Sequence, residues 1–355
     1  MTPLLSLLSI LFGFYPRASL HAKYVVYSIS FFLVTSAAAS YALYIDYAAS
    51  FHKKSLRMKT NTAIVVTTME IFFLILSSGV VIIEFTRKHV DMSRLNIQLC
   101  KVERKLSYAD KTWRFRYKEL LNVMFICYYL VIIIIDMYYW HILIWNIRYY
   151  YACYLFKLSI ITFQLIYSDL TFRISKAFLH TNALLMRYFQ INATYECDYK
   201  RIPPPLTSIE LCSYQNVQLE DKEYSLSEMI TIHTTLCSAV QQVNAIYGFT
   251  LLTILLSTCF HFTTAPYFFF LNLFYPAVYG TNDFGFLILQ IFWILTYFFQ
   301  LLIIIVPASK ASQEAHNTGV ILCEFLSKHF NYAVLNQVPN LCIVRCLLLA
   351  VLVAY

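Results

Sequence analysis

Apolar residues in this chain gather into six stretches of about 20 residues, separated by more polar segments. A helix of that length, rising ~1.5 Å per residue, crosses the roughly 30 Å hydrocarbon core of a bilayer. The pattern therefore predicts an all-α, multi-pass membrane protein. The predicted spans are Tyr24–Tyr44, Ala63–Ile83, Leu120–Trp140, Tyr149–Tyr167, Tyr247–Tyr267 and Phe284–Val306.

Three of these spans are expected to continue as helices outside the membrane. Phe172 to Phe189 holds no Gly or Pro and can extend span four. From Leu226, apolar residues recur at intervals of three and four and lead into span five, and a similar stripe follows span six beyond Val306. Such stripes need partners, and the pattern leaves two open: packing within one chain, or a bundle that joins several copies.

The composition excludes a soluble protein, because 59% of the residues are hydrophobic and 13% are charged, against about 25% charged in a soluble domain. One polytopic bundle is expected, with the bilayer as a partner. The apolar start, Met1–Phe14, is predicted to be an interfacial helix that ends at Pro16.

The net charge is +8, and the distribution of the Lys and Arg residues among the loops predicts the orientation of the chain in the membrane. The N-terminus and the segments after spans two, four and six hold 20 Lys and Arg, whereas the other three loops hold 5. Positive residues concentrate on the cytosolic side, so the N-terminus is predicted to be cytosolic, and no nucleic-acid partner is implied. The predicted parts are a cytosolic segment 1–23, a bundle 24–306 with cytosolic extensions 84–119 and 168–246, a cytosolic helix 307–340 and a terminal apolar segment 341–355.

The sequence contains no recognisable catalytic motif. No two of the nine His fall within five residues of each other, and there is no Gly-x-Ser-x-Gly, Walker or Cys-x-x-Cys pattern. We therefore expect no enzyme activity, no metal and no cofactor.

Ionisable residues within the spans are the strongest signs of function, since charge at membrane depth is costly. Glu70 and Lys157 lie at matching depths, about 10 Å and 12 Å from the outer ends of spans two and four. Asp136 lies nearer the outer surface in span three. Two readings stay open: a buried Glu70–Lys157 pair joined by Asp136, or a snorkelling Lys157 with Glu70 hydrogen-bonded to a neighbouring helix.

Aromatic and amide side chains accompany these charges near the outer ends of the spans. Trp293 lies about 13 Å deep, beyond the interfacial aromatic belt. Such groups are typical of a mostly apolar small-ligand site with a few polar anchors, here predicted to open outward. His261 is expected to be a core residue. The candidate ligand-binding residues are Glu70, Asp136, Tyr139, Trp140, Lys157, Tyr267, Gln290, Trp293 and Tyr297.

Three motifs give the chain a family resemblance. Leu11–Pro16 (LFGFYP) is similar to a short Gly-to-Pro element before span one. Leu236–Gly248 (LCSAVQQVNAIYG) is similar to a Leu-x-x-x-Val-x-x-x-Asn-x-x-(Phe/Tyr)-Gly pattern before span five, and Ala311–Leu322 (ASQEAHNTGVIL) is similar to a run after span six. In order, spacing and topology these resemble the insect gustatory receptors, over about residues 10–325.

The resemblance implies a ligand-gated, non-selective cation channel subunit that detects small tastants. It also implies a homo- or hetero-tetramer held together by its cytosolic helices, in the plasma membrane of a chemosensory neuron. A pocket among the spans would take the ligand, and the last helices would surround the pore.

The end of the chain departs from the family pattern. Members carry Thr-Tyr, five apolar residues and Gln-Phe in a seventh span, and nothing after Leu326 matches this. Leu341–Tyr355 is short and interrupted by Arg345, so an incomplete seventh helix is expected and no pore residue is assigned. Two alternatives to a conducting receptor therefore stay open: a secondary transporter coupled through the charges in the spans, or a non-conducting modulatory subunit.

Overall fold

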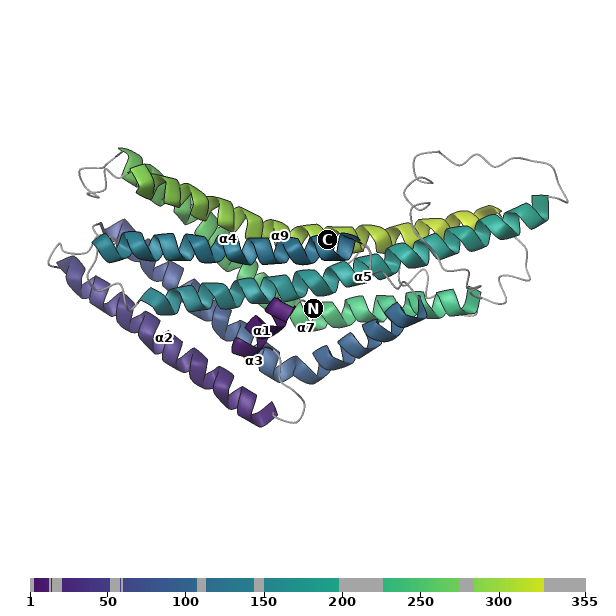
Figure 1. The fold of residues 1–355 in the computed structure, drawn as a ribbon, viewed down its shortest axis with the longest axis horizontal. Coiled ribbons are helices and arrows are strands. Elements are labelled where there is room, and N and C mark those ends of the chain that lie inside the picture. The colour runs from purple at the N-terminus through teal and green to yellow at the C-terminus, as the bar shows by residue number, and fades with distance from the viewer. Residues whose placement is uncertain are drawn as a thin grey trace. The chain divides into compact units, whose positions relative to one another are not determined.

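The protein is helical throughout the part that the structure describes. The computed structural model describes residues 3–12, 14, 21–51, 58, 60–106, 113–143, 150–197, 226–274 and 284–328, and no strand occurs among them (Figure 1). The terminal segment 341–355 lies outside these residues. The helices are α1 (Pro3–Leu11), α2 (His21–Phe51), α3 (Asn61–Lys105), α4 (Trp113–Leu143), α5 (Tyr151–Cys197), α7 (Leu226–Phe274) and α9 (Phe284–Lys328).

Six of these helices are long and apolar enough to cross a membrane, each overlapping one predicted span. The multi-pass helical prediction is therefore confirmed. The helices exceed the predicted bounds, however: α2 ends at Phe51 and α7 at Phe274, so helix replaces part of the loops expected there. The length of an apolar stretch gives only the minimum length of a membrane helix. The backbone hydrogen bonds of the helix can continue into the polar residues on either side.

The predicted continuity of three helices is also confirmed. α5 runs unbroken through Phe172–Phe189, α7 begins at Leu226 and includes span five, and α9 passes Val306. Pro266 and Pro307 lie inside α7 and α9. Membrane helices tolerate such prolines because neighbouring hydroxyls satisfy freed backbone groups.

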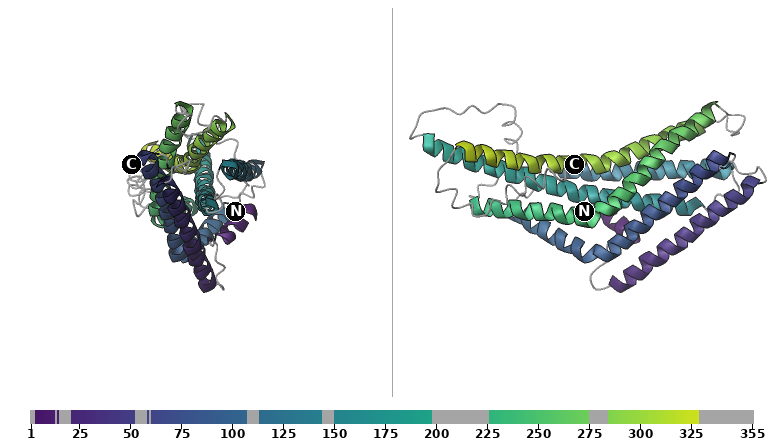
Figure 2. Two further views of the ribbon diagram at one scale, coloured as in Figure 1. Left: turned by 90° about the vertical axis from the view of Figure 1, so that its left-hand side faces the viewer. Right: turned by 180° about the vertical axis from the view of Figure 1, so that it is seen from behind.

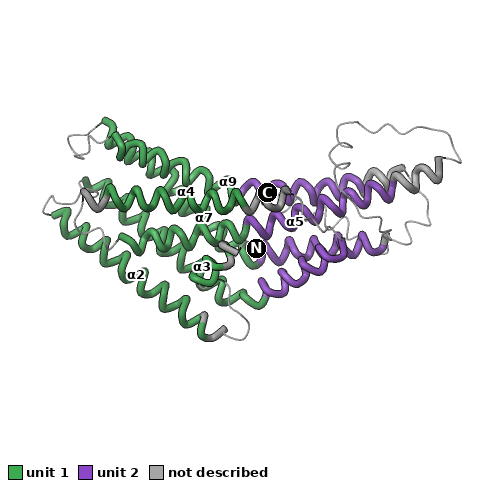
Figure 3. The backbone as a smooth tube through the Cα atoms, in the orientation of Figure 1, with its two compact units in different colours: residues 1–90, 111–167, 246–304 green, residues 91–110, 168–245, 305–355 purple. Residues whose placement is uncertain are grey.

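The chain divides into two compact units (Figure 3). Unit 1 comprises residues 1–90, 111–167 and 246–304. Unit 2 comprises residues 91–110, 168–245 and 305–355. Four helices, α3, α5, α7 and α9, contribute residues to both units. In α3 the division lies next to Lys88, whose backbone leaves the helical range (φ −102°, ψ 15°).

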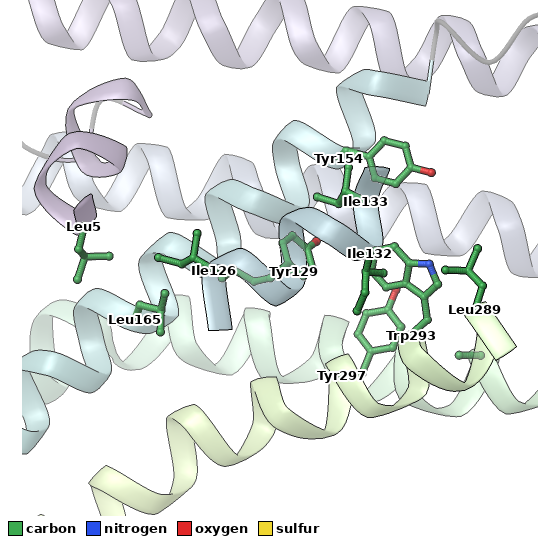
Figure 4. Close-up of a cluster of buried hydrophobic side chains, with 12 residues drawn as sticks. Leu5, Ile126, Tyr129, Ile132, Ile133, Tyr154, Leu165, Leu289, Trp293 and Tyr297 are labelled. Carbon is green, nitrogen blue, oxygen red and sulfur yellow. The ribbon is translucent and has the colours of Figure 1, made fainter. Parts of the chain in front are cut away.

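Unit 1 has a core built from five helices (Figure 4). Tyr129 of α4 and Ile161 of α5 are completely buried in it. So is Leu5 of α1, which means that the predicted interfacial helix packs into this core. α2 and the first part of α3 run antiparallel beside each other (Figures 1 and 2), and Gly79 of α3 lies directly against the ring of Phe32.

Unit 2 is organised around α5, which contacts three other helices. Arg173 donates two hydrogen bonds to Glu103 of α3, from Nε to Oε1 at 2.8 Å and from Nη2 to Oε2 at 2.9 Å. Asn182 accepts a hydrogen bond from Thr318 of α9. Phe178 meets the ring of His233 on α7 edge to face. These contacts join segments far apart in the sequence. Unit 2 is therefore held together by polar side-chain contacts as well as by apolar packing.

Candidate functional site

The candidate site is centred on a buried lysine in unit 1. Lys157 of α5 places its Nζ 4.1 Å from the centroid of the Trp293 ring and donates a hydrogen bond of 3.2 Å to the hydroxyl of Tyr297. Trp293 and Tyr297 lie four residues apart on α9, so both project from one face of the helix. A cation over an aromatic ring is stabilised by the ring quadrupole, more strongly when water is excluded.

Three rings form a row beside this lysine. His261 of α7 stacks on Tyr297, with centroids 5.3 Å apart and ring planes 9° apart. Tyr297 stacks in turn on Trp293 at 5.8 Å and 27°. All three side chains are buried. We call His261, Tyr297 and Trp293 the ring row; Figure 4 shows its Trp293 end within the unit 1 core.

Glu70 of α3 lies at the His261 end of the ring row. Its Oε1 accepts a hydrogen bond of 2.7 Å from Thr264 and lies 3.7 Å from Nδ1 of His261. His261 and Thr264 are three residues apart on α7 and therefore approach Glu70 together. A quarter of the Glu70 side chain remains exposed.

The structure bears on both readings of the charges in the spans. Among the described residues Glu70 and Lys157 form no ion pair; the ring row connects them, through His261 and Tyr297. The expected hydrogen bond from Glu70 to a neighbouring helix is present, to Thr264. Lys157 does not snorkel, since its ammonium is held by the aromatic rings. The matching depths therefore correctly indicated that Glu70 and Lys157 lie near each other, but the two side chains are not in direct contact.

Asp136 of α4 is held by a contact with α5 in the same unit. It is buried and accepts a hydrogen bond from the hydroxyl of Tyr154 on α5. Tyr129, seven residues or about two helical turns before Asp136 on α4, meets the Trp293 ring edge to face at 5.9 Å. Through Tyr154, Asp136 thus adjoins the aromatic core that also contains Trp293 and Tyr297.

The remaining predicted residues are less closely involved. Tyr139 is partly buried and packs against the unit 1 core. Tyr267 and Gln290 are partly buried, and their roles in ligand binding stay predictions. Trp140 lies in α4, but its side chain is outside the described part.

Four residues of the cluster were not expected from the sequence: Tyr129, Tyr154, His261 and Thr264. His261 was expected to be an ordinary core residue, and it is buried, but it also joins the ring row and approaches Glu70. Its spacing from Thr264 was a usable signal, because two polar residues three apart share one helix face. Nothing in the sequence pairs that face with Glu70.

Two polar atoms of this cluster are buried without a hydrogen-bond partner: the hydroxyl of Tyr129 and Nε2 of His261. Buried polar atoms are almost always satisfied, so each such atom in a native protein calls for a water, ion or ligand. The described residues include no group of three or more His, Cys, Asp or Glu suited to a metal.

A family model described as "7tm Chemosensory receptor" matches residues 3–338 of the chain. The chain belongs to this family. The match covers all the helices described above.

A curated relative of this chemosensory receptor is the "Gustatory receptor for sugar taste 43a" of Drosophila melanogaster. The two are 30% identical over 109 residues. The matched part is 31% of this chain and 24% of the relative, so the similarity spans about a quarter of the relative's length. The predicted resemblance to gustatory receptors is therefore confirmed at the level of the family.

Proposed function

We propose that this chain is a gustatory-type chemoreceptor subunit that binds a small tastant among its membrane helices and opens a non-selective cation channel. The observation that carries the proposal is the family match over residues 3–338, which includes every helix that builds the Lys157 cluster. The cluster has the chemistry of a small-ligand site: aromatic faces, a few charges and buried polar atoms without partners.

Membership of the family also supports a proposal for the cellular location and the oligomeric state of the protein. A receptor of this kind acts without enzyme chemistry, in the plasma membrane of a chemosensory neuron, as a homo- or hetero-tetramer of related subunits. The relative named for sugar taste supports taste as the sensory modality. Both aromatic faces and the carboxylates Glu70 and Asp136 are compatible with a small tastant.

Ligand-evoked current tests the proposal. The full chain, alone and with related receptor subunits, is expressed in cultured cells, and whole-cell current is recorded during application of a tastant panel. A receptor channel gives a reversible current whose reversal potential stays near zero when external Na⁺ is replaced by K⁺ or Cs⁺. Absence of evoked current under all conditions, with the protein confirmed at the surface by labelling, would reject the proposal.

A variant pair links the current to the candidate site. Trp293→Leu removes the ring that holds the Lys157 ammonium and is expected to weaken the response at unchanged surface level. Phe249→Leu is the matched control, because Phe249 is 61% exposed and lies away from the ring row. Equal responses from the two variants would place the ligand elsewhere.

A secondary transporter is the second candidate, favoured by one observation: three ionisable residues, Glu70, Asp136 and Lys157, lie within candidate membrane spans of unit 1. Ionisable groups at membrane depth often couple ion and substrate movement. Labelled-tastant uptake distinguishes the two. A transporter accumulates substrate in proportion to charge moved, whereas a channel passes current without stoichiometric uptake of its ligand.

A further inference from the structure

Two of the three sequence motifs that carry the family resemblance meet in unit 1, on the ring of Phe85 in α3. Phe14 belongs to the motif Leu11–Pro16, and its ring lies 5.0 Å from that of Phe85. Tyr247 belongs to the motif Leu236–Gly248, and its ring meets Phe85 edge to face at 6.4 Å. All three residues are at most 4% exposed. Phe85 therefore connects the start of the chain to α7.

α3 bends three residues after Phe85, at Lys88, where the backbone leaves the helical range (φ −102°, ψ 15°). Sharp bends in helices almost always have an identifiable cause, such as a Pro, a Gly/Ser pair or an inserted side chain. Phe85–Asp91 (FTRKHVD) contains no Pro, Gly or Ser. The hydroxyl of Thr86 binds two carbonyls of the preceding turn, a pattern that weakens a helix slightly. The local sequence therefore permits a bend here without imposing one.

The side chain of Lys88 joins the bend to α7. Its Nζ lies 2.5 Å from Oε2 of Glu84, one turn earlier on α3, and donates a hydrogen bond of 3.5 Å to the carbonyl oxygen of Ile246. Lys88 and Phe85 thus contact adjoining residues of α7, Ile246 and Tyr247. These contacts with a distant part of the chain supply the cause of the bend that the local sequence lacks.

Phe14 is the ring partner of Phe85 that belongs to the shortest element. The other two, Phe163 and Tyr247, lie on α5 and α7, helices of 47 and 49 residues. Phe14 follows α1, a helix of 9 residues. Isolated helices shorter than about 12–15 residues are marginal in water, so α1 depends on docking for its order. Release of this segment would remove one of three rings around Phe85 and leave every membrane helix in place.

We propose that the N-terminal segment, residues 3–14, is a conformational switch for α3. While Phe14 lies on Phe85, α3 bends at Lys88 and donates to the carbonyl of Ile246. When Phe14 leaves, α3 regains the straight backbone that its local sequence favours, and its contact with α7 is released. The switch requires neither a particular ligand nor conduction.

The switch also gives the N-terminal segment a route to the candidate site. α3 and α7 meet again there, where Thr264 donates a hydrogen bond of 2.7 Å to Glu70. Sites far apart are coupled through an element that has two arrangements and that both sites bias. The α3–α7 pair is such an element when α3 can be bent or straight.

Hydrogen exchange of the full chain distinguishes the switch from a simple loss of stability. The protein is placed in phosphatidylcholine nanodiscs, and mass spectrometry follows exchange in two peptides, 84–92 of α3 and 246–253 of α7. Phe14→Ala should slow exchange in the α3 peptide by about 2- to 10-fold, because a helix that straightens regains backbone hydrogen bonds. It should speed exchange in the α7 peptide, which loses its contacts with α3.

Further variants assign these opposite changes to the bend. Phe14→Leu keeps an apolar side chain and should give the same signs with a smaller size, which covers the case in which Phe14→Ala does not fold. Lys88→Met keeps every ring, removes the bond to Ile246 and should give the same pair of changes. Phe73→Ala is the matched control, because Phe73 packs on Phe260 at 5.0 Å and so joins the same two helices away from the bend. It should not slow exchange in the α3 peptide.

The outcomes separate this inference from the proposed function. Unchanged or faster exchange of the α3 peptide in Phe14→Leu or Lys88→Met would show a fixed bend and overturn the switch. A slowing that Phe73→Ala reproduces would overturn it as well. Current plays no part in this test, so a fixed bend leaves the channel proposal intact, and a chain that does not conduct leaves the switch intact.

Discussion

Lys157 and Trp293 form a cation–π pair between α5 and α9, with Nζ 4.1 Å from the centroid of the indole ring. The lysine reaches no carboxylate directly among the described residues; its hydrogen-bond acceptor is Tyr297. The ring and the hydroxyl thus solvate an ammonium inside the membrane-spanning unit. Both partners of the pair are therefore expected to matter together.

A double-mutant cycle measures this coupling. Lys157→Met and Trp293→Leu, alone and combined, should show a coupling free energy of about 0.5–2 kcal/mol, because the pair is shielded from water. Unfolding of the purified protein in mixed detergent micelles provides the free energies. Lys101→Met, at an exposed lysine of unit 2, replaces Lys157→Met in the control cycle. Effects that add within about 0.3–0.5 kcal/mol would mean that the two residues act independently.

Gly79 is expected to resist even the smallest substitution. A Cβ at this position would lie 2.9 Å from Cζ of Phe32 and 3.2 Å from its Cε2. Gly79→Ala should therefore destabilise unit 1 by about 1–3 kcal/mol, the usual effect of overpacking. The same unfolding assay measures it. Phe32→Leu in the Gly79→Ala background should recover part of the loss, and a failure to recover would locate the strain elsewhere.

Thr318 should contribute more to stability than an ordinary helical threonine. It is completely buried and donates to Oδ1 of Asn182, which donates to the backbone oxygen of Glu314 at 2.9 Å. Thr318→Val removes this donor and should cost about 1–3 kcal/mol, because the buried Asn182 oxygen loses its partner. Thr231→Val is the control, since exposed Thr231 bonds locally to the Ser227 carbonyl. Similar melting temperatures for the two variants would contradict the prediction.

Arg173 is not expected to tolerate lysine. It binds both oxygens of Glu103 and also donates to Asn96 at 3.3 Å. A lysine cannot form this two-point contact, so Arg173→Lys should lower stability by about 1–3 kcal/mol. Arg173→Gln should cost more, because it leaves the half-buried Glu103 without a cation. Thermal unfolding of the three proteins gives the order, and an Arg173→Lys variant as stable as the native chain would show that charge alone suffices.

The membrane helices were predictable because they depend on length and composition. Every predicted span overlaps one of the six long helices, and the stripes after Leu226 and Val306 correctly indicated unbroken helices. The helix ends were less well predicted. α2 and α7 outlast their apolar stretches, since hydrogen bonding along the helix does not require apolar side chains.

The sequence predicted how deep the charged residues of the candidate site lie in the spans, but not which side chains they contact. Counting residues from the span ends put Glu70 and Lys157 at similar depths, and in the structure His261 and Tyr297 lie between them. Their partners, His261 and Tyr297, depend on how α7 and α9 are rotated about their axes. A sequence with apolar residues on all sides of each helix carries little information about that rotation.

The sequence by itself determined the class of this protein, its spans and its family, because these follow from local apolar length and from motifs along the chain. The tertiary structure alone decided that the Lys157 charge is met by Trp293 and Tyr297 while Glu70 is met by Thr264 and His261. The physical reason is that a buried charge is stabilised only by groups within a few ångströms of it. Those distances are set by the packing of helices from distant parts of the chain.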